Sequence, residues 1–481
     1  MPISHMDAVL YLRAQLPIRC RNFGWRPEQR HRGNARRILT DDLGAAARRG
    51  IVRSRTGLVA LVIFVLAGAV ACTSDSAGRS SAPAAPTTTA ADHATHPPSA
   101  PVAADASPTQ LRARFEQLLG EHALLAMRLT RSQVAKTADF EQVAEASLQH
   151  NSDALSQLVE TAYDDIQGDR FQQLWQGYVT DLSTYASAAA NQDASAKQQA
   201  RAELMAYCDD YGAWLATASN GQVQPDDATR TARTRVMGLM GQIDAYAARD
   251  YSQAYKLARD TYQTTFTAGA TLTKASVTPK AAAKLDTPPE QLRSAFAMLL
   301  GEHMELIIDA QRATFAGAPE FEAAAAQVNA NTATLTKAIG AIVGPTKAAE
   351  FEAAWANHVE GLLAYSTAVA DKDEAAKETA AQNLSGFGAR LAFYFSDIVR
   401  NKLPVEALTE VLGVHDKHLI EQINAYAAND YAKAEKLQLE GYQQMLGVAN
   451  TLVDAIQRMV KSGLPVGGSR TGGGGTAQPS R

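Results

Sequence analysis

Apolar side chains recur every three to four residues through most of the chain beyond residue 108, which is the spacing of amphipathic helices. Leu292, Phe296, Leu299 and Leu300 form one such stripe. Ala, Leu, Glu, Gln and Lys dominate, and Pro and Gly fall mostly between the periodic segments. The pattern therefore predicts an all-α protein. The expected helices of the first half lie near residues 108–135, 138–165, 168–190, 193–218, 227–248 and 250–274, and the second half adds about 180 to each number.

The second half of this helical region repeats the first. Residues 109–122 (TQLRARFEQLLGEH) align with residues 290–303 (EQLRSAFAMLLGEH). Such a repeat predicts two tandem units, at residues 108–275 and 289–462, joined by a linker at residues 276–288. Long amphipathic helices with short joints favour an antiparallel bundle of five to six helices in each unit. Further matching pairs are Phe140 with Phe321, Asn151 with Asn331, and Trp175 with Trp355.

An uncharged apolar run of 15 residues, 57–71 (GLVALVIFVLAGAVA), directly precedes Cys72. The run is shorter than the roughly 20 apolar residues that span a membrane, and four arginines lie just upstream, as in a signal peptide. The small residues before Cys72 resemble a bacterial lipobox, so we expect a lipoprotein signal peptide at residues 52–71 and an acyl chain on Cys72. The expected partner is then a cell membrane, with the protein anchored on its extracytoplasmic side. A plain secretory signal followed by a chance cysteine is the alternative.

Three further segments are expected to lie outside the helical units. Residues 72–107 are rich in Ser, Ala, Pro and Thr, and they are predicted to form a flexible tether behind the lipid. Residues 463–481 are rich in glycine and are predicted to be disordered. Signal peptides begin close to their basic segment, so residues 1–51 are interpreted as an upstream leader and Val52 as the true initiator.

Charge is distributed unevenly along the 481 residues. The formal net charge is −4, but residues 1–55 hold twelve arginines against four acidic residues, and the chain beyond residue 71 holds 34 basic and 46 acidic residues. The acidic helical region argues against nucleic acid as a partner, because phosphate binding needs a basic face. Cys208 is the one cysteine of the helical region and is expected to be a small buried apolar residue.

Three histidines of the second unit fall on the apolar stripes of three different predicted helices. His303, His358 and His415 each stand at helical spacing from apolar neighbours, so their imidazoles are expected to face the interior. Helical bundles build metal sites from facing helices, and imidazole suits copper, zinc and iron. The three side chains therefore form a candidate transition-metal site, with His418 as a fourth ligand and Glu302 as a flanking one. The alternative is that each is a core histidine satisfied by hydrogen bonds.

The first unit offers an internal comparison. The positions that match the three histidines hold His122, Tyr178 and Arg235, and Gly238 stands opposite His418. Of these residues only His122 carries an imidazole, and Arg235 has a guanidinium where the second unit has the imidazole of His415. The first unit is therefore not expected to bind a divalent metal in the same way, and the second unit is the expected functional one.

The paired LLGEH units behind a lipoprotein signal resemble exported bacterial helical-bundle proteins, some of which are tied to metals such as copper. The resemblance covers the helical units. It implies a helical-bundle fold but no particular activity. A weaker similarity to ferritin-like and hemerythrin-like bundles implies iron inside the bundle. Glu302 and His303 are adjacent, however, and do not have the Glu-x-x-His spacing of the ferritin-like sites.

Three hypotheses of function follow. The sequence contains no Gly-x-Ser-x-Gly elbow, paired Cys-x-x-Cys or His-Glu-x-x-His motif, so catalysis is not expected. The leading hypothesis is a membrane-anchored, non-catalytic binding protein with copper, zinc or iron in its second unit. The second is a scaffold or protein-interaction lipoprotein with structural histidines. The third is a hemerythrin-type oxygen-binding protein or oxidase.

Overall fold

The computed structural model describes residues 106–137 and 141–461, and every regular element in these residues is a helix. The prediction of an all-α helical bundle is confirmed. In chain order the helices are α3 (Pro108–Ala135), α4 (Glu141–Ala162), α5 (Asp165–Asn191), α6 (Ala194–Ala218), α7 (Pro225–Ala247), α8 (Tyr251–Ser276), α9 (Pro279–Ala282), η1 (Ala283–Asp286), α10 (Pro288–Ala316), α11 (Phe321–Val343), α12 (Pro345–Asp371), α13 (Glu374–Ser385), α14 (Phe387–Ile398), α15 (Val405–Ala427) and α16 (Tyr431–Lys461).

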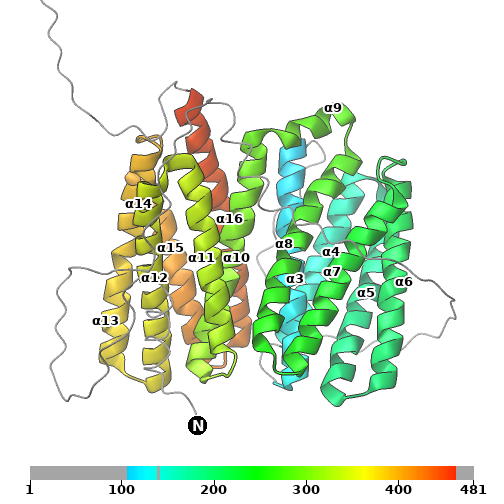
Figure 1. The fold of residues 1–481 in the computed structure, drawn as a ribbon, viewed down its shortest axis with the longest axis horizontal. Helices are drawn as coiled ribbons and strands as arrows, with labels where there is room; N and C mark the ends of the chain where they lie inside the picture. Colours follow the sequence, from blue (N-terminus) through cyan, green and yellow to red (C-terminus); the bar gives the residue numbers. More distant parts are fainter. Residues whose placement is uncertain (1–105, 138–140, 462–481) are drawn as a thin grey trace, which may run out of the picture.

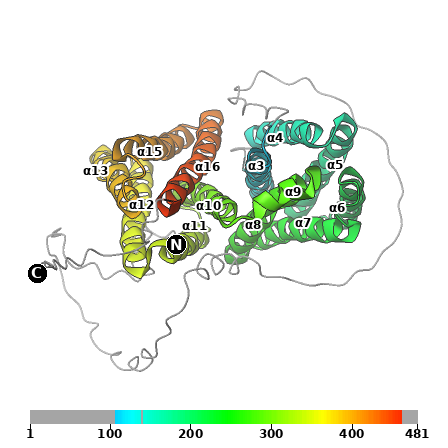
Figure 2. The same ribbon diagram turned by 90° about the horizontal axis from the view of Figure 1, so that it is seen from above.

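The long helices stand side by side in two groups (Figure 1). Helices α3 to α8 pack on one another and form the first helical group, and α10 to α16 form the second helical group. Figure 2 shows the two groups from above, with α3 and α8 facing the second group. Between the groups, α3 contacts α10 and α16, α8 contacts α10 and α11, and α4 contacts α16. The two short helices α9 and η1 lie in the segment predicted as a linker.

The second helical group has one helix break that the sequence pattern did not predict. A single helix is expected near residues 373–398, but the structure has α13 and α14, separated at Gly386. Glycine is about 1 kcal/mol less favourable than alanine inside a helix. The matching residue of the first group is Ala206, which lies within the unbroken helix α6. The break makes Phe387 the first residue of α14.

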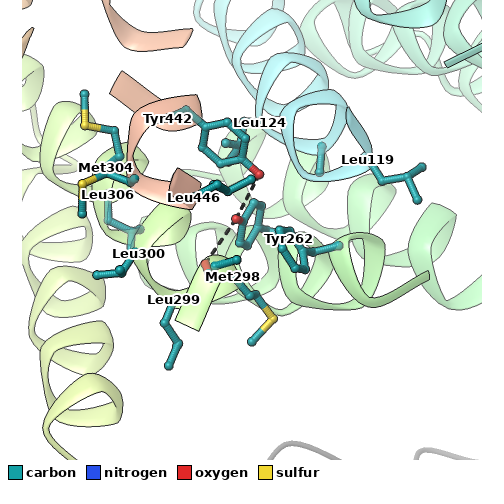
Figure 3. Packing of buried hydrophobic residues seen from close by; sticks show 14 of the residues in the cluster. Leu119, Leu124, Tyr262, Met298, Leu299, Leu300, Met304, Leu306, Tyr442 and Leu446 are labelled. Carbon is teal, nitrogen blue, oxygen red and sulfur yellow. Dashed lines mark hydrogen bonds between the residues drawn. The ribbon is translucent and has the colours of Figure 1, made fainter. Parts of the chain in front are cut away.

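The glycine of the repeated LLGEH sequence lets tyrosines pack between the two groups. The hydroxyl oxygens of Tyr262 and Tyr442 are 3.2 Å apart, and Tyr262 donates to the carbonyl of Met298 at 3.2 Å (Figure 3). A Cβ atom at Gly120 would lie 2.1 Å from the Tyr442 hydroxyl, and one at Gly301 would lie 2.7 Å from the Tyr442 ring. Both glycines are therefore required by the packing between the groups.

Substitution of Gly120 by alanine is expected to lower the free energy of unfolding by about 2–3 kcal/mol, because the new methyl group overlaps Tyr442. Gly177 provides the control, since it lies inside α5 and a Cβ there would meet nothing within 4 Å. Gly177→Ala is expected to raise the free energy of unfolding by about 0.5–1 kcal/mol through helix propensity alone. Urea unfolding measures both variants. Similar stability of the two variants would show that Tyr442 does not constrain α3.

The glutamate of the LLGEH sequence is held in a similar way in both groups. Asn331 donates to Glu302 at 2.7 Å, and Asn151 donates to Glu121 at 3.2 Å. Gln263 of the first group also donates to Glu302 across the boundary, at 2.7 Å. In both helical groups, the glycine and the glutamate of the LLGEH sequence therefore make contacts between helices.

Buried ion pairs also cross the boundary between the groups. Arg128 of α3 contacts Glu305 of α10 at 2.9 Å and also contacts Glu435 of α16. Arg131 contacts Asp309 at 2.8 Å. Burial raises the pKa of Glu305, but Arg128, Arg312 and the hydrogen bond from Gln438 together outweigh this effect and leave that pKa below its ordinary value. Charged groups at this boundary are therefore stabilised by one another.

Several predicted segments lie outside the described residues. These are the leader at residues 1–51, the signal peptide at 52–71, Cys72, the tether up to residue 105, and the tail from residue 463. Within residues 106–137 and 141–461, no helix combines the length and the hydropathy that crossing a bilayer requires.

Candidate metal centre

Three helices of the second helical group bring His303, His358 and His415 together. Helix α10 carries His303, α12 carries His358 and α15 carries His415, and each pair of these helices is in contact. The exposed fractions of the three residues are 0%, 1% and 1%. The three histidines singled out from the sequence therefore share one buried place in the bundle.

The distances among the three imidazoles suit a single metal ion. The ring centroids of His358 and His415 are 5.5 Å apart, and each is 6.0 Å from that of His303. One nitrogen from each ring lies within 4.8 Å of the other two. Three nitrogens bound to one ion at about 2.0–2.1 Å would be about 3.5 Å apart, so small side-chain movements close the difference. In the described part of the chain, no other group of three His, Cys, Asp or Glu side chains has ligand atoms so close together.

The ring nitrogens of the three histidines have no hydrogen-bond partner among the described residues. Buried polar groups nearly always have one, so six such atoms in one place require an explanation. Burial lowers the pKa of His303 and His358 well below the ordinary value and lowers that of His415 to about 3. All three imidazoles are therefore neutral at pH 7 and keep the lone pair that a metal ion needs.

Aromatic rings enclose the histidines. The ring of Trp355 lies 4.5 Å from that of His303, and Phe387 stacks on His358 with 4.0 Å between centroids and 12° between planes. Phe387 takes this position at the start of α14, directly after the helix break at Gly386. The walls of the candidate site are therefore largely apolar.

Asp416 is the carboxyl group beside the candidate site. Its Oδ1 atom lies 3.4 Å from Nδ1 of His358, without the alignment of a hydrogen bond. Burial raises the pKa of Asp416 to about 8, and Arg390 acts in the opposite direction. A carboxylate behind a ligating histidine commonly fixes the orientation and the tautomer of the ring. With Nδ1 facing Asp416, Nε2 is the nitrogen of His358 left for a metal.

The structure does not bring His418 or Glu302 into this cluster. His418 shares a hydrogen bond of 3.1 Å with Gln444, and Glu302 is bonded to Asn331 and Gln263. Each residue along a helix turns the side-chain direction by 100°, so Glu302 points away from its neighbour His303. His418 lies one turn beyond His415 and points to α16 instead. The two flanking ligands expected from the sequence thus have other partners.

The matching place in the first helical group is filled differently. Nε2 of His122 shares a hydrogen bond of 3.3 Å with the Tyr178 hydroxyl, and Tyr178 stacks on Tyr207 at 4.8 Å. Arg235 is only 5% exposed, and its guanidinium carbon lies 5.1 Å from the centre of the Tyr211 ring. In the first helical group the Arg235 guanidinium therefore lies among aromatic rings, at the position where the second helical group has the His415 imidazole.

Two residues of the candidate site were not found from the sequence. Asp416 directly follows His415, and a carboxylate next to an inward-facing histidine is a signal that could have identified it. Phe387 gave no such signal, because its contact with His358 depends on the break at Gly386.

Comparison of the chain with protein-family models, curated proteins and solved structures found no match.

Proposed function

We propose that the protein is a lipid-anchored, extracytoplasmic binding protein that holds a transition-metal ion through His303, His358 and His415. The observation that carries this proposal is the convergence of three buried imidazoles whose ring nitrogens have no partner among the described residues. Copper, zinc and iron all accept imidazole ligands. The proposed role is binding, without a catalytic step.

Metal analysis of the full-length protein tests the proposal. After loading and desalting, plasma mass spectrometry is expected to find about one transition-metal ion per chain, because binding to a buried site survives desalting. The His358→Tyr variant, which copies Tyr178 of the first group, is expected to retain none. A wild-type protein without metal after loading would overturn the proposal.

Asp416→Asn is expected to weaken metal binding by about 10-fold, because the Asp416 carboxyl group lies 3.4 Å from Nδ1 of His358 and fixes the orientation of that ring. The variant keeps the size of the side chain, so the stability of the metal-free protein should change little. Glu410→Gln, on the exposed face of the same helix, is the control and should leave the affinity unchanged. Equal affinities in both variants would show that Asp416 does not position His358.

The proposed anchoring depends on the sequence before residue 106. The 15-residue apolar run and Cys72 support a lipid anchor, and an acyl chain on Cys72 would hold the helical groups at a membrane surface. Cys72→Ser is expected to move the protein from the membrane fraction to the soluble fraction of the cells that produce it. Retention of the variant in the membrane fraction would contradict lipidation at Cys72.

The hemerythrin-type hypothesis finds less support in the geometry. A di-iron centre of this kind needs carboxylates beside the imidazoles. Glu302 is bonded to Asn331 and Gln263, and Asp416 lies against the Nδ1 side of His358. A site for one ion therefore fits the donors better than a site for two.

A further inference from the structure

The three donors of the proposed site are imidazoles, which carry no charge when they bind a metal ion. An imidazole binds a metal ion through the lone pair of its neutral form, and Glu302 is hydrogen-bonded to Asn331 and Gln263 instead of facing the cluster. The free energy of moving an ion from water into an apolar interior grows with the square of its charge, so a divalent ion costs about four times as much as a monovalent one. A buried site made only of neutral donors therefore favours a single positive charge.

The first helical group shows that this place in the fold accommodates one positive charge. Arg235 occupies the position that matches His415, and its guanidinium is buried beside the Tyr211 ring. Tyr178 and Tyr207, which match His358 and Phe387, complete the aromatic surroundings. The same arrangement of helices thus encloses a monovalent cation in one group and three metal-binding rings in the other.

The number of donors also bears on the identity of the ion. Zinc with three histidine ligands keeps a fourth position for water, and a buried water needs polar partners of its own. The rings of Trp355 and Phe387 border His303 and His358 and offer apolar surface instead. Cu(I) has a filled d shell and accepts three nitrogen donors in a plane, and imidazole is a suitable ligand for copper.

We propose that His303, His358 and His415 bind copper in its monovalent state, Cu(I), as a three-coordinate ion. This inference rests on the metal site of the proposed function and assigns its chemical class. Trp355 and Phe387 would then serve to exclude water and further ligands from the bound ion.

Competition titrations on the full-length protein test the assignment. Under anaerobic conditions the protein is titrated with Cu(I) against a chromogenic Cu(I) chelator, and separately with Zn²⁺ and Cu²⁺ against chelators of known affinity. We expect one Cu(I) per chain, bound at least about 100-fold more tightly than Zn²⁺ and lost in His358→Tyr. X-ray absorption of the Cu(I) protein should show about three nitrogen donors near 2.0 Å and no sulfur donor.

Each other outcome decides a different point. Tighter binding of Zn²⁺ or Cu²⁺ than of Cu(I), with the same loss in His358→Tyr, would overturn the assignment to Cu(I) and leave the proposed metal site intact. A sulfur donor in the absorption spectrum would also overturn the three-imidazole coordination. Absence of any binding that depends on His358 would overturn both the assignment and the proposed function.

Discussion

His358→Tyr is expected to weaken metal binding by about 1,000-fold. Structural metal sites with four ligands bind with about 10–16 kcal/mol, so each ligand contributes about 2.5–4 kcal/mol, and the upper figure corresponds to this factor. The substitution copies the first helical group, where Tyr178 occupies the matching position and shares a hydrogen bond with His122. A folded variant without metal is therefore the expected product, and equilibrium competition with a chelator measures its affinity.

The stability of the same variant separates metal binding from a purely structural role. The ring nitrogens of His358 have no partner among the described residues, so the metal-free protein gains little from them. We expect metal-free His358→Tyr to unfold at a urea concentration close to that of the metal-free wild type. A large loss of stability together with unchanged affinity would support the alternative in which the histidines are structural.

His418→Ala is the matched control for this experiment. His418 lies on the same helix as His415 but bonds to Gln444, away from the cluster. Its removal is expected to leave metal affinity within about two-fold of the wild type, since His418 contacts Gln444 and not the three imidazoles. A loss as large as that of His358→Tyr would restore His418 as a ligand.

Arg128→Met is expected to lower the free energy of unfolding by about 3–5 kcal/mol at neutral pH, because it removes the guanidinium that contacts both buried carboxylates, Glu305 and Glu435. The pKa of Glu305 lies below its ordinary value of 4.5 in the folded protein, so the stability supplied by this pair is present above that pH and is lost as the pH falls. The difference between variant and wild type should therefore shrink below about pH 4.5. Urea unfolding across this pH range measures it.

Arg230→Met provides the comparison at the surface. Arg230 also contacts an acidic residue, Asp227, but the two side chains are 62% and 59% exposed. The expected loss is below about 0.5 kcal/mol, because solvent screens exposed pairs. A similar loss in the two arginine variants would contradict the view that burial gives the pair between the helical groups its effect.

Much of the fold can be predicted from the sequence because it depends on local patterns. The spacing of apolar residues predicts the all-α class, and the first-half helix boundaries lie within about three residues of those observed. The break at Gly386 was not predicted, since one glycine inside a periodic segment is compatible with either an unbroken or a broken helix. The LLGEH sequence marked the repeat, but only the structure shows that Gly120 and Gly301 accommodate Tyr442.

The candidate site shows where prediction from the sequence stops. Helical periodicity selects His303, His358 and His415 because each faces the interior of its own helix, and the packing of α10, α12 and α15 brings them together. Helical periodicity does not determine which partners a side chain at the edge of a helix face contacts. His418 and Glu302 were included for this reason, and the structure gives them partners elsewhere.

Crystals of the full-length protein loaded with copper would locate the bound ion, through the anomalous difference map at the copper absorption edge. We expect one strong peak, at about 2.0 Å from a ring nitrogen of each of His303, His358 and His415. A peak at another place, such as beside His418 and Glu440, or a loaded protein without a peak among the three histidines, would contradict it.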